Sequence, residues 1–389
     1  MNFAQQAKSI ESFLLETRRD FHQHPELPMQ EFRTSQKVKE FLAAEGIELL
    51  PLDTPTSLAA VIRGGKSGRA VALRAELDAL PITEECELPF KSVNPGVMHA
   101  CGHDVHLTCL MGAAKLLKAN AVHLAGDVVL LFQAAEENTL GAKQMIAAGV
   151  MEHRFDAVFG LHTNTGIPAG DVAFLPGPAQ ASASLFHIEI KGRGGHGAFP
   201  HTTVDPVMIA AQLVTQLQTI VSRNLDPVKT GVLSVCQISA GTSPNIIPET
   251  ASVAGTIRAL EAGTVDLIVE RMRAICAGIE SAYGCSCVLD APEGLPPVVN
   301  DPALTAMAAA SCAAVLGAEH VGTLAPAMVG DDASVFMSLV PGVLGALGVR
   351  NEEKGIIHGN HTPRFCVDEA CLPVGAACLA QMAWDYLSK

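Results

Sequence analysis

Two short apolar segments, residues 127–132 and 156–161, constrain the fold of this chain most strongly. Both have the length and composition of a buried β-strand, and a helical segment from Ala142 to Ala148 lies between them. This strand–helix–strand alternation predicts an α/β fold with a mainly parallel sheet and helices on both of its faces. Ligands of such sheets bind beyond the carboxyl ends of the strands. Polar residues that directly follow these segments are therefore candidates for a functional site.

Ligand-type side chains stand at both strand ends. Glu136 and Glu137 follow the first segment, and His162 ends the second. Successive residues of a strand point to opposite faces, so we expect one glutamate to bind a metal while its neighbour faces the cavity as a general base. Two further carboxylates, Glu76 and Asp78, end an earlier strand. They bind a metal, orient a metal-bound histidine, or are solvated acids at a strand end.

The stretch from Met98 to His106 adds a dense group of metal-binding side chains. It holds one thiol, three imidazoles and a carboxylate. Cys101 and His103 are separated by a single glycine, which suits zinc or manganese held on a tight loop. An apolar helix is expected from Leu107 to Leu117, so the group lies where a loop enters a helix. The alternative interpretation is a cytosolic thiol beside surface histidines.

Composition bounds the number of domains and the partners. With 389 residues, of which 49% are hydrophobic and 17% charged, the chain is long enough for two globular domains. A net charge of −14 without a basic run argues against a nucleic-acid partner. The 11 cysteines show no metal-finger or paired spacing, so we expect reduced thiols in the cytoplasm. We find no signal peptide and no membrane-spanning run, so no membrane partner is expected.

The segments before the Cys101 region predict further helices and strands. Hydrophobic periodicity indicates helices over 4–20 and 32–45. His22 and His24 lie where the first helical region ends, and they suit packing or loop positions better than ligand positions. Segments 58–63 and 70–74 predict a pair of strands around a glycine-rich turn. That turn lacks the Walker spacing, so a phosphate-binding loop is not expected.

From about residue 180 the order of predicted elements changes. The chain continues with a strand at 185–191, a helix at 207–223, strands at 231–240 and 252–260, a helix at 265–283 and a strand at 285–290. This order is typical of a ferredoxin-like α+β module. We therefore expect a discontinuous first domain, 1–180 and 296–389, interrupted by an inserted domain at 181–295. A glycine-rich loop in the insert would present His196 to a site in the first domain.

Nine short motifs follow one another over nearly the whole chain. They are His24-Pro25-Glu26-Leu27, residues 73–81, residues 98–106, Ala135-Glu136-Glu137, Gly160-Leu161-His162, residues 194–198, Asn245-Ile246-Ile247-Pro248, Gly255-Thr256-Ile257-Arg258 and His361-Thr362-Pro363. Together they resemble the aminoacylase/carboxypeptidase family of metallopeptidases. The resemblance is to its amidohydrolase branch, which includes hippurate hydrolase, auxin-conjugate hydrolases and N-acetyldiaminopimelate deacetylase.

The resemblance implies a metal centre and assigns roles to particular residues. The implied metal ligands are Cys101, His103, Glu137, His162 and His361, a set that suits two divalent ions sharing a bridging group and a water. Manganese is the usual metal of relatives, and zinc, cobalt or nickel are alternatives. Glu136 takes the position of the general base, and His196 that of a histidine that stabilises the oxyanion when the domains close. Asn245 and Arg258 match lid residues that meet the substrate.

The implied reaction is cleavage of the amide bond of N-acyl amino acids to a carboxylate and a free amino acid, by a metal-activated water with Glu136 as general base. The alternatives are a carboxypeptidase or dipeptidase, an N-acetyldiaminopimelate deacetylase, and a catalytically silent metal-binding assembly protein. The expected partners are a small substrate and a second copy of the chain, bound through the inserted lid and dimerisation domain. Glu76, Gly330, Asp331 and Ala333 depart from the family pattern. These departures bear on substrate choice and leave the implied ligands intact.

Overall fold

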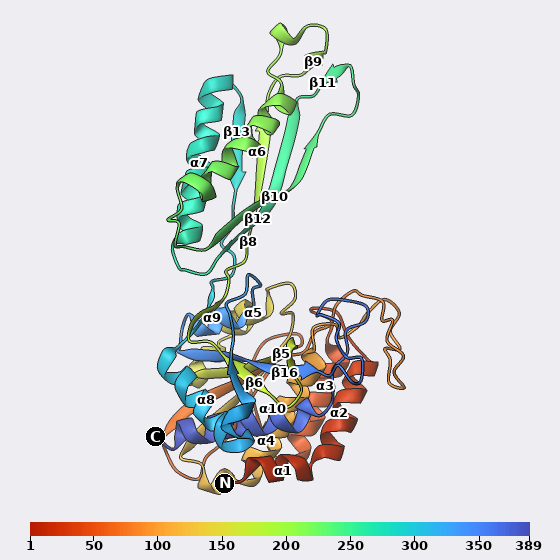
Figure 1. Cartoon of the computed structure of the whole chain (residues 1–389), viewed down its shortest axis with the longest axis vertical. Helices are drawn as coiled ribbons and strands as arrows, with labels where there is room; N and C mark the ends of the chain where they lie inside the picture. Colours follow the sequence, from red (N-terminus) through yellow and green to blue (C-terminus); the bar gives the residue numbers. More distant parts are fainter. The chain divides into compact units, whose positions relative to one another are not determined.

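The computed structural model describes residues 1–389, and the chain forms two compact units (Figure 1). Unit 1 contains Met1–Gly177, Val299–Ala325 and Asp332–Lys389, so it holds both termini. Unit 2 contains Pro178–Val298 together with Pro326–Asp331. The second unit thus takes a short return segment from the later part of the chain, which the sequence patterns do not indicate. Each unit has its own hydrophobic core.

Unit 1 is built on an eight-stranded sheet with the strand order β1-β2-β4-β3-β5-β16-β6-β15. The strands are β1 (Glu48–Leu50), β2 (Leu58–Ile62), β3 (Arg69–Glu76), β4 (Gly126–Gln133), β5 (Val158–Pro168), β6 (Val172–Phe174), β15 (Val321–Thr323) and β16 (Gly342–Arg350). The central strands β4, β3, β5 and β16 run parallel to one another. Antiparallel pairs occur toward both sides of this parallel centre. The predicted α/β fold with a largely parallel sheet is therefore confirmed.

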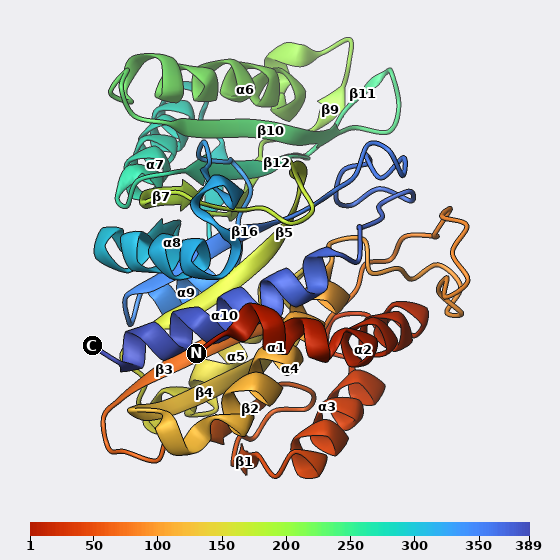
Figure 2. The ribbon, with the colours of Figure 1, turned by 60° about the horizontal axis from the view of Figure 1, so that its bottom comes forward.

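Helices cover both faces of this sheet. They are α1 (Phe3–Ser9), α2 (Glu11–Gln23), α3 (Phe32–Ala44), α4 (His103–Ala119), α5 (Gly141–Ala147), α8 (Pro302–Leu316), α9 (Ala333–Met337) and α10 (Cys371–Leu387). Alternate residues of β4 face opposite layers, because successive strand side chains point to opposite faces. Leu130 packs in the core that includes α4 and α10, which lie against each other (Figure 2). Leu131 packs in the separate core that includes α5 and α9.

The predicted pairing of segments 58–63 and 70–74 is wrong. Strand β4 lies between β2 and β3, antiparallel to the first and parallel to the second. The glycine-rich turn does not close a hairpin; it packs against the backbone that leads into β4. A methyl group on Gly64 would lie 2.2 Å from the carbonyl oxygen of Gly126. Glycine is required here because another chain segment approaches closely.

The single helix expected over 4–20 is also interrupted. Helix α1 ends at Ser9 and α2 begins at Glu11, with Ile10 outside helical geometry. Apolar periodicity continues across the break, so the sequence pattern did not indicate it. Short 3₁₀ turns occur at Ala121–His123, Val150–His153, Pro200–Thr202 and Ala318–His320. None of the helices combines the length and apolar composition needed to span a lipid bilayer.

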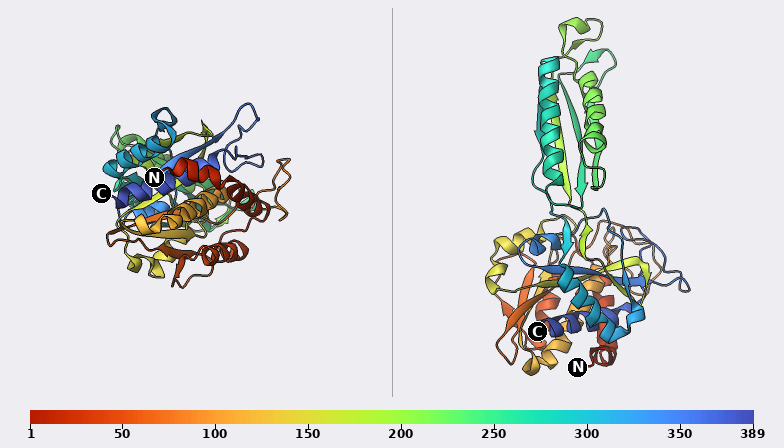
Figure 3. Two further views of the ribbon diagram at one scale, coloured as in Figure 1. Left: turned by 90° about the horizontal axis from the view of Figure 1, so that it is seen from below. Right: turned by 60° about the vertical axis from the view of Figure 1, so that its left-hand side comes forward.

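Unit 2 has a four-stranded antiparallel sheet with the strand order β10-β12-β8-β13. Its elements are β8 (Ser184–Lys191), α6 (Pro206–Arg223), β10 (Gly231–Ala240), β12 (Thr250–Ala259), α7 (Thr264–Tyr283) and β13 (Ser286–Asp290). The two helices lie side by side and share a core with the sheet (Figure 3). A small pair, β9 (Gly195–His196) with β11 (Ile246–Ile247), extends the unit. Strands β7 (Gly177–Gln180) and β14 (Val298–Asn300) form a separate two-stranded sheet.

The packing of the glycine-rich turn predicts the outcome of Gly64→Ala. The added methyl group overlaps the Gly126 carbonyl, so the free energy of unfolding should fall by about 1–3 kcal/mol. Gly278→Ala is a matched control: it lies in α7 with no atom within 4 Å of the added methyl group. It should be neutral or stabilise by about 0.5–1 kcal/mol. Thermal and denaturant unfolding measure the stability of both variants. An unchanged free energy of unfolding in Gly64→Ala would contradict the close approach of Gly64 to the Gly126 carbonyl.

Candidate metal centre

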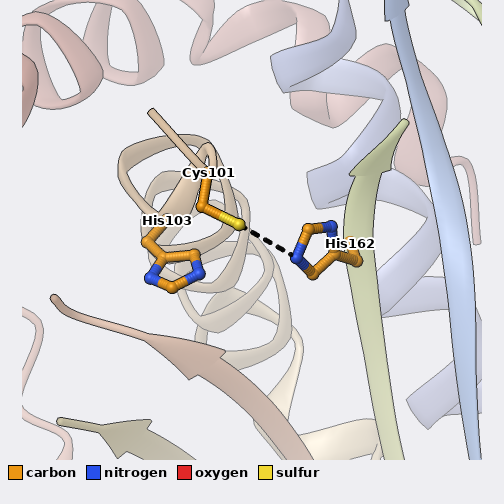
Figure 4. A group of neighbouring side chains, drawn as sticks. All are labelled: Cys101, His103 and His162. Atoms are coloured by element: carbon orange, nitrogen blue, oxygen red, sulfur yellow. Dashed lines mark hydrogen bonds between the residues drawn. The ribbon is translucent and has the colours of Figure 1, made fainter. Parts of the chain in front are cut away.

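Five side chains from separate parts of unit 1 bring their ligating atoms together. Cys101 precedes α4, His103 is its first residue, Glu137 lies in the turn after β4, His162 is in β5, and His361 follows β16. Within each of two groups, Cys101–His103–His162 and Cys101–Glu137–His361, the ligating atoms lie within 4.8 Å of one another. Figure 4 shows the first group, in which the Cys101 Sγ atom lies 3.4 Å from the His162 Nε2 atom. All five residues implied by the family resemblance therefore converge on one region.

The loop before α4 depends on Gly102. This glycine has a φ of +92°, a conformation that side chains with a Cβ rarely adopt. A methyl group at this position would lie 2.6 Å from the Thr163 hydroxyl oxygen. That hydroxyl donates a hydrogen bond of 2.7 Å to the carbonyl of Cys101. The glycine thus lets β5 hold the loop while Cys101 and His103 point into the same space.

Asp78 fixes two of the candidate ligands at once. Its Oδ1 atom lies 3.2 Å from the His103 Nδ1 atom, and its carbonyl oxygen lies 2.9 Å from the same nitrogen. Its Oδ2 atom accepts a hydrogen bond of 2.9 Å from the backbone amide of Glu137. The Nε2 atom of His103 is thereby directed toward Glu137. Because Asp78 is fully buried, the alternative of a solvated acid is wrong at this position.

Glu76 is buried as well and holds a different histidine. Its Oε2 atom accepts a hydrogen bond of 2.6 Å from His106 Nδ1. Burial lowers the pKa of His106 to about 4, so the ring is neutral at pH 7. Its Nε2 atom accepts a hydrogen bond from the backbone amide of Thr163. His106 therefore supports the end of β5, and its ring nitrogens are not available to a metal.

The expected separation of Glu136 and Glu137 to opposite faces is wrong. Strand β4 ends at Gln133, and both glutamates lie in a turn beyond it. Ala135 in this turn has a φ of +54°, so strand alternation does not apply there. Both carboxylates face His103: the distances from its Nε2 atom are 3.8 Å to Glu136 Oε2 and 3.9 Å to Glu137 Oε1. The two acids therefore share one side of the candidate centre.

Buried atoms at this centre fit a divalent cation. His103 Nε2 and Glu137 Oε1 are both buried without a well-formed hydrogen bond; Glu137 Oε1 lies 3.9 Å from His103 Nε2 and 3.5 Å from His361 Nε2. A buried polar atom without a partner is costly, and a positive ion placed between these groups would satisfy both. The donor set of thiolate, imidazole and carboxylate is one that zinc and manganese accept. The residues present therefore fit the metal that the sequence motifs imply.

The same groups have strongly shifted pKa values. Burial alone would raise the pKa of the Cys101 thiol, but His162 and His103 reverse this effect and lower it to about 6. Hydrogen bonding to Cys101 and Glu137 raises the pKa of His361 to about 10. For His103, burial opposes the charged form, yet Cys101 and Asp78 still raise its pKa well above the ordinary value. Without a metal, the centre thus holds anions and protonated imidazoles.

Two N-terminal histidines lie outside this group, in keeping with the packing positions expected for them. His22 is fully buried and lies between two carboxylates, at 2.9 Å from Asp104 Oδ2 and 3.1 Å from Glu84 Oε1. The Nδ1 atom of His24 lies 2.8 Å from the carbonyl oxygen of Asp20. His22 supports α4 through Asp104, the residue that follows His103.

The remaining candidates lie in unit 2. His196 in β9 is exposed and pairs with Ile246 in β11. The backbone amide of Gly197 donates to the carbonyl of Asn245 at 2.9 Å, so His196 and Asn245 are neighbours. Arg258 lies on β12, away from this small pair in the sequence and in a different sheet.

Comparison with known proteins decides the family. Residues 72–385 match Peptidase family M20/M25/M40. Thermostable carboxypeptidase 2 of Saccharolobus solfataricus is 41% identical over 386 residues, covering 98% of this chain and 97% of the relative. The chain belongs to the M20/M25/M40 family. It is therefore a metal-dependent hydrolase, and the resemblance drawn from the nine motifs is confirmed.

Two more relatives of this M20 hydrolase show the range of the family. N-acetylcysteine deacetylase of Bacillus subtilis is 37% identical over 380 residues, covering 97% of each chain. A solved structure from Bacillus subtilis, described as a dinuclear metal binding peptidase of the M20 family, matches with a TM-score of 0.87 and 34% identity. It covers 98% of this chain and 99% of its own. The fold of the M20 hydrolase thus extends over its whole length.

The sequence allowed for Asp78 orienting a metal-bound histidine, but its contact with Glu137 and the turn around Ala135 were missed. The only signal for Asp78 was a carboxylate at the end of an apolar strand, which leaves its partners open. No feature of the sequence indicates the positive φ of Ala135, because alanine does not favour that conformation.

The pKa values predict how the metal-free protein takes up a divalent ion. His103 and His361 carry protons at pH 7 because their pKa values are raised, and both must lose them to coordinate a metal. Adding Mn²⁺ or Zn²⁺ at pH 7 should therefore release protons. Lowering the pH toward 6 also protonates Cys101, so the apparent affinity should fall further. Calorimetric titration in buffers of different ionisation enthalpy measures the proton release.

Cys101→Ala should lower metal content and release fewer protons, since the thiolate that raises the two imidazole pKa values is gone. Cys236→Ala is the matched control because this thiol is exposed in unit 2. Equal metal content in the Cys101→Ala variant and the unaltered protein would exclude Cys101 as a ligand.

Proposed function

We propose that this M20 hydrolase cleaves the amide bond of N-acyl amino acids, giving a carboxylic acid and a free amino acid. The observation that carries the proposal is a buried carboxylate, Glu136, beside a cluster of five ligand-type side chains. The similarity to N-acetylcysteine deacetylase over nearly the whole chain supports an acyl substrate. A carboxypeptidase is the second candidate, because a relative with that name is 41% identical.

For the metal centre we propose two divalent ions, in line with the dinuclear centre described for the Bacillus subtilis peptidase. The proposed ligands are Cys101, His103, Glu137, His162 and His361. Manganese is the proposed metal, and the thiolate also suits zinc. When bound, the ions supply Lewis-acid chemistry that lowers the pKa of water and polarises the scissile carbonyl.

Glu136 then carries the proton transfers. Its carboxylate takes a proton from the attacking water and passes it to the leaving nitrogen, so the products are a carboxylic acid and an amine, between which the remaining acidic proton then redistributes. Its neighbour Glu137 is tied through its amide to Asp78, so the turn presents one carboxylate for binding and one for proton transfer. The carboxylate of Glu136, as the group that transfers protons, must be able to change its hydrogen-bond partner during turnover.

Unit 2 supplies the proposed substrate contacts. We propose that it acts as a lid, with His196 stabilising the oxyanion and Asn245 and Arg258 meeting the substrate. The planar fork of Arg258 suits the free carboxylate of an N-acyl amino acid. We also propose that this unit forms the contact in a homodimer. The 11 free thiols favour a reducing compartment, so we propose the cytoplasm as the location.

Replacing the general base should separate chemistry from binding. Glu136→Gln keeps the size of the side chain but cannot accept the proton, so kcat should fall at least about a hundredfold. Metal content and melting temperature should stay near those of the unaltered protein. Glu152→Gln, an exposed residue of the same unit, is the control and should leave kcat unchanged. Near-normal turnover of Glu136→Gln would remove Glu136 from this role.

A substrate panel tests the reaction itself. N-acetyl, N-benzoyl and longer N-acyl amino acids should release free amino acid with the manganese-loaded protein and not with a chelated sample. Peptides with a free carboxyl terminus in the same panel test the carboxypeptidase alternative. Faster release from peptides than from every acyl amino acid would favour that second candidate. No release from any substrate, with metal shown to be bound, would overturn the proposed substrate class and favour the N-acetyldiaminopimelate deacetylase alternative.

A further inference from the structure

The turn that carries Glu136 is held by side chains from three other segments. The backbone amide of Ala134 donates to Ser57 Oγ at 3.0 Å, that of Ala135 to Glu31 Oε1 at 2.8 Å, and that of Glu137 to Asp78 Oδ2 at 2.9 Å. Strand β4 has ended, so these amides have no partner in the sheet. Buried amides outside regular structure need such partners, and the partners fix the path of the chain.

This path is strained at Ala135. Its φ of +54° places an alanine in the left-handed region, which costs of the order of 1 kcal/mol in the absence of compensation. Gly141 packs against the carbonyl oxygen of Ala134, where a methyl group would lie at 1.6 Å. The carbonyl of Ala135 accepts the amides of Leu140 and Gly141. Both sides of the Ala135 peptide unit are therefore specified by contacts, as a strained backbone requires.

Among the groups that hydrogen-bond to Ala135 in this turn, only Glu31 is charged, and its side chain is completely buried. Its carboxylate accepts three hydrogen bonds: from the amide of Ala135, from the amide of Met29 at 3.0 Å, and from the Thr56 hydroxyl at 2.8 Å. Burial raises the pKa of this carboxyl, and hydrogen bonds from Thr56 and Ala135 act against that rise. A buried acid with this set of donors serves as a fixed anchor rather than a mobile group.

We propose that Glu31 is a positioning residue for the hydrolytic reaction: by holding the amide of Ala135, it keeps the strained turn in the conformation that directs the Glu136 carboxylate into the centre. The inference rests on the proposed role of Glu136. Ser57 and Asp78 hold the amides on either side, so loss of Glu31 should release only the middle of the turn. Glu137, tied separately to Asp78, should stay in place as a ligand.

The consequence of removing the anchor is a change in geometry, not in binding. Misplacement of a catalytic group by about 1 Å can cost about a hundredfold in rate. Glu31→Ala should therefore lower kcat about ten- to a hundredfold, with KM changed by less than about threefold. Metal content, measured by mass spectrometry of the purified protein, should remain that of the unaltered chain. If Glu31→Ala does not fold, Glu31→Asp carries the same expectation, because it is one methylene too short to reach Ala135.

Two rescue variants separate positioning from general stability. Glu31→Gln has an oxygen that can accept from Ala135 and Met29 and an amide group that can donate to Thr56, so it should recover most of the lost kcat. Glycine adopts positive φ without strain, so Ala135→Gly combined with Glu31→Ala should also recover part of the loss. Absence of recovery in both variants, or a Glu31→Ala kcat within about threefold of the original, would overturn the proposal.

Glu26 provides a matched control. Its carboxylate also accepts two backbone amides, those of Arg33 and Thr34, but it holds the start of α3 and not the turn. Glu26→Ala should lower the melting temperature while leaving kcat within about twofold. A parallel loss of kcat in the Glu26→Ala and Glu31→Ala variants, in proportion to their loss of stability, would assign Glu31 a structural role only.

A double-mutant cycle distinguishes failure of this proposal from failure of the proposed function. In the Glu136→Gln background, adding Glu31→Ala should change the residual rate by less than about threefold, because the group it positions is gone. If Glu31→Ala lowers the rate of the Glu136→Gln variant as much as it lowers that of the unaltered protein, Glu31 acts through a group other than Glu136. That result would overturn the inference. Normal turnover of Glu136→Gln alone would instead overturn the role of Glu136 itself.

Discussion

The carboxylate of Asp78 connects the two parts of unit 1 on which the metal centre depends. One oxygen orients His103 at the start of α4, and the other holds the amide of Glu137 beyond β4. The contact with His103 is buried and that with Glu137 is partly buried, so water weakens them little. Without this bridge the Nε2 atom of His103 and the carboxylate of Glu137 would each have to find a position independently. A single acid therefore sets the separation of two candidate ligands.

Further buried charges extend this support into the rest of the unit. Arg74 on β3 bridges Glu76 and Asp332, and Asp332 accepts hydrogen bonds from Gln133 and from the amide of Ala142 at the start of α5. On the other side of α4, Arg18 and His22 both contact Asp104. Buried ion pairs contribute little net stability, because desolvation offsets their attraction. Their geometric requirement is what matters here: they fix the ends of β3, β4 and α4 relative to one another.

Several elements near the centre follow from local sequence rules. The apolar runs of β4 and β5 and the helix after Cys101 could be assigned from composition and periodicity, because both faces of the sheet are covered. The pairing partner of β2 and β3 could not be assigned in this way. Both strands pair with β4, which lies more than 50 residues further along the chain. Pairing partners depend on long-range contacts that no local pattern encodes. The same limit applies to Glu136 and Glu137, whose turn is shaped by Ser57, Glu31 and Asp78.

The sequence by itself determined the family, the α/β class and the residue types available for a metal centre, because ordered motifs and strand–helix alternation are local properties of the chain. Only the tertiary structure decided which carboxylates are buried and what they hold. Glu76 and Asp78 look alike as neighbours at a strand end, yet one holds His106 and the other holds His103 and Glu137. Their roles differ because β3 ends at Glu76 while Asp78 lies two residues beyond the strand, so the two side chains meet different neighbours, which arrive from α4 and from the turn after β4. Hydrogen-bond partners are set by where distant segments meet, and that is a property of the packed molecule alone.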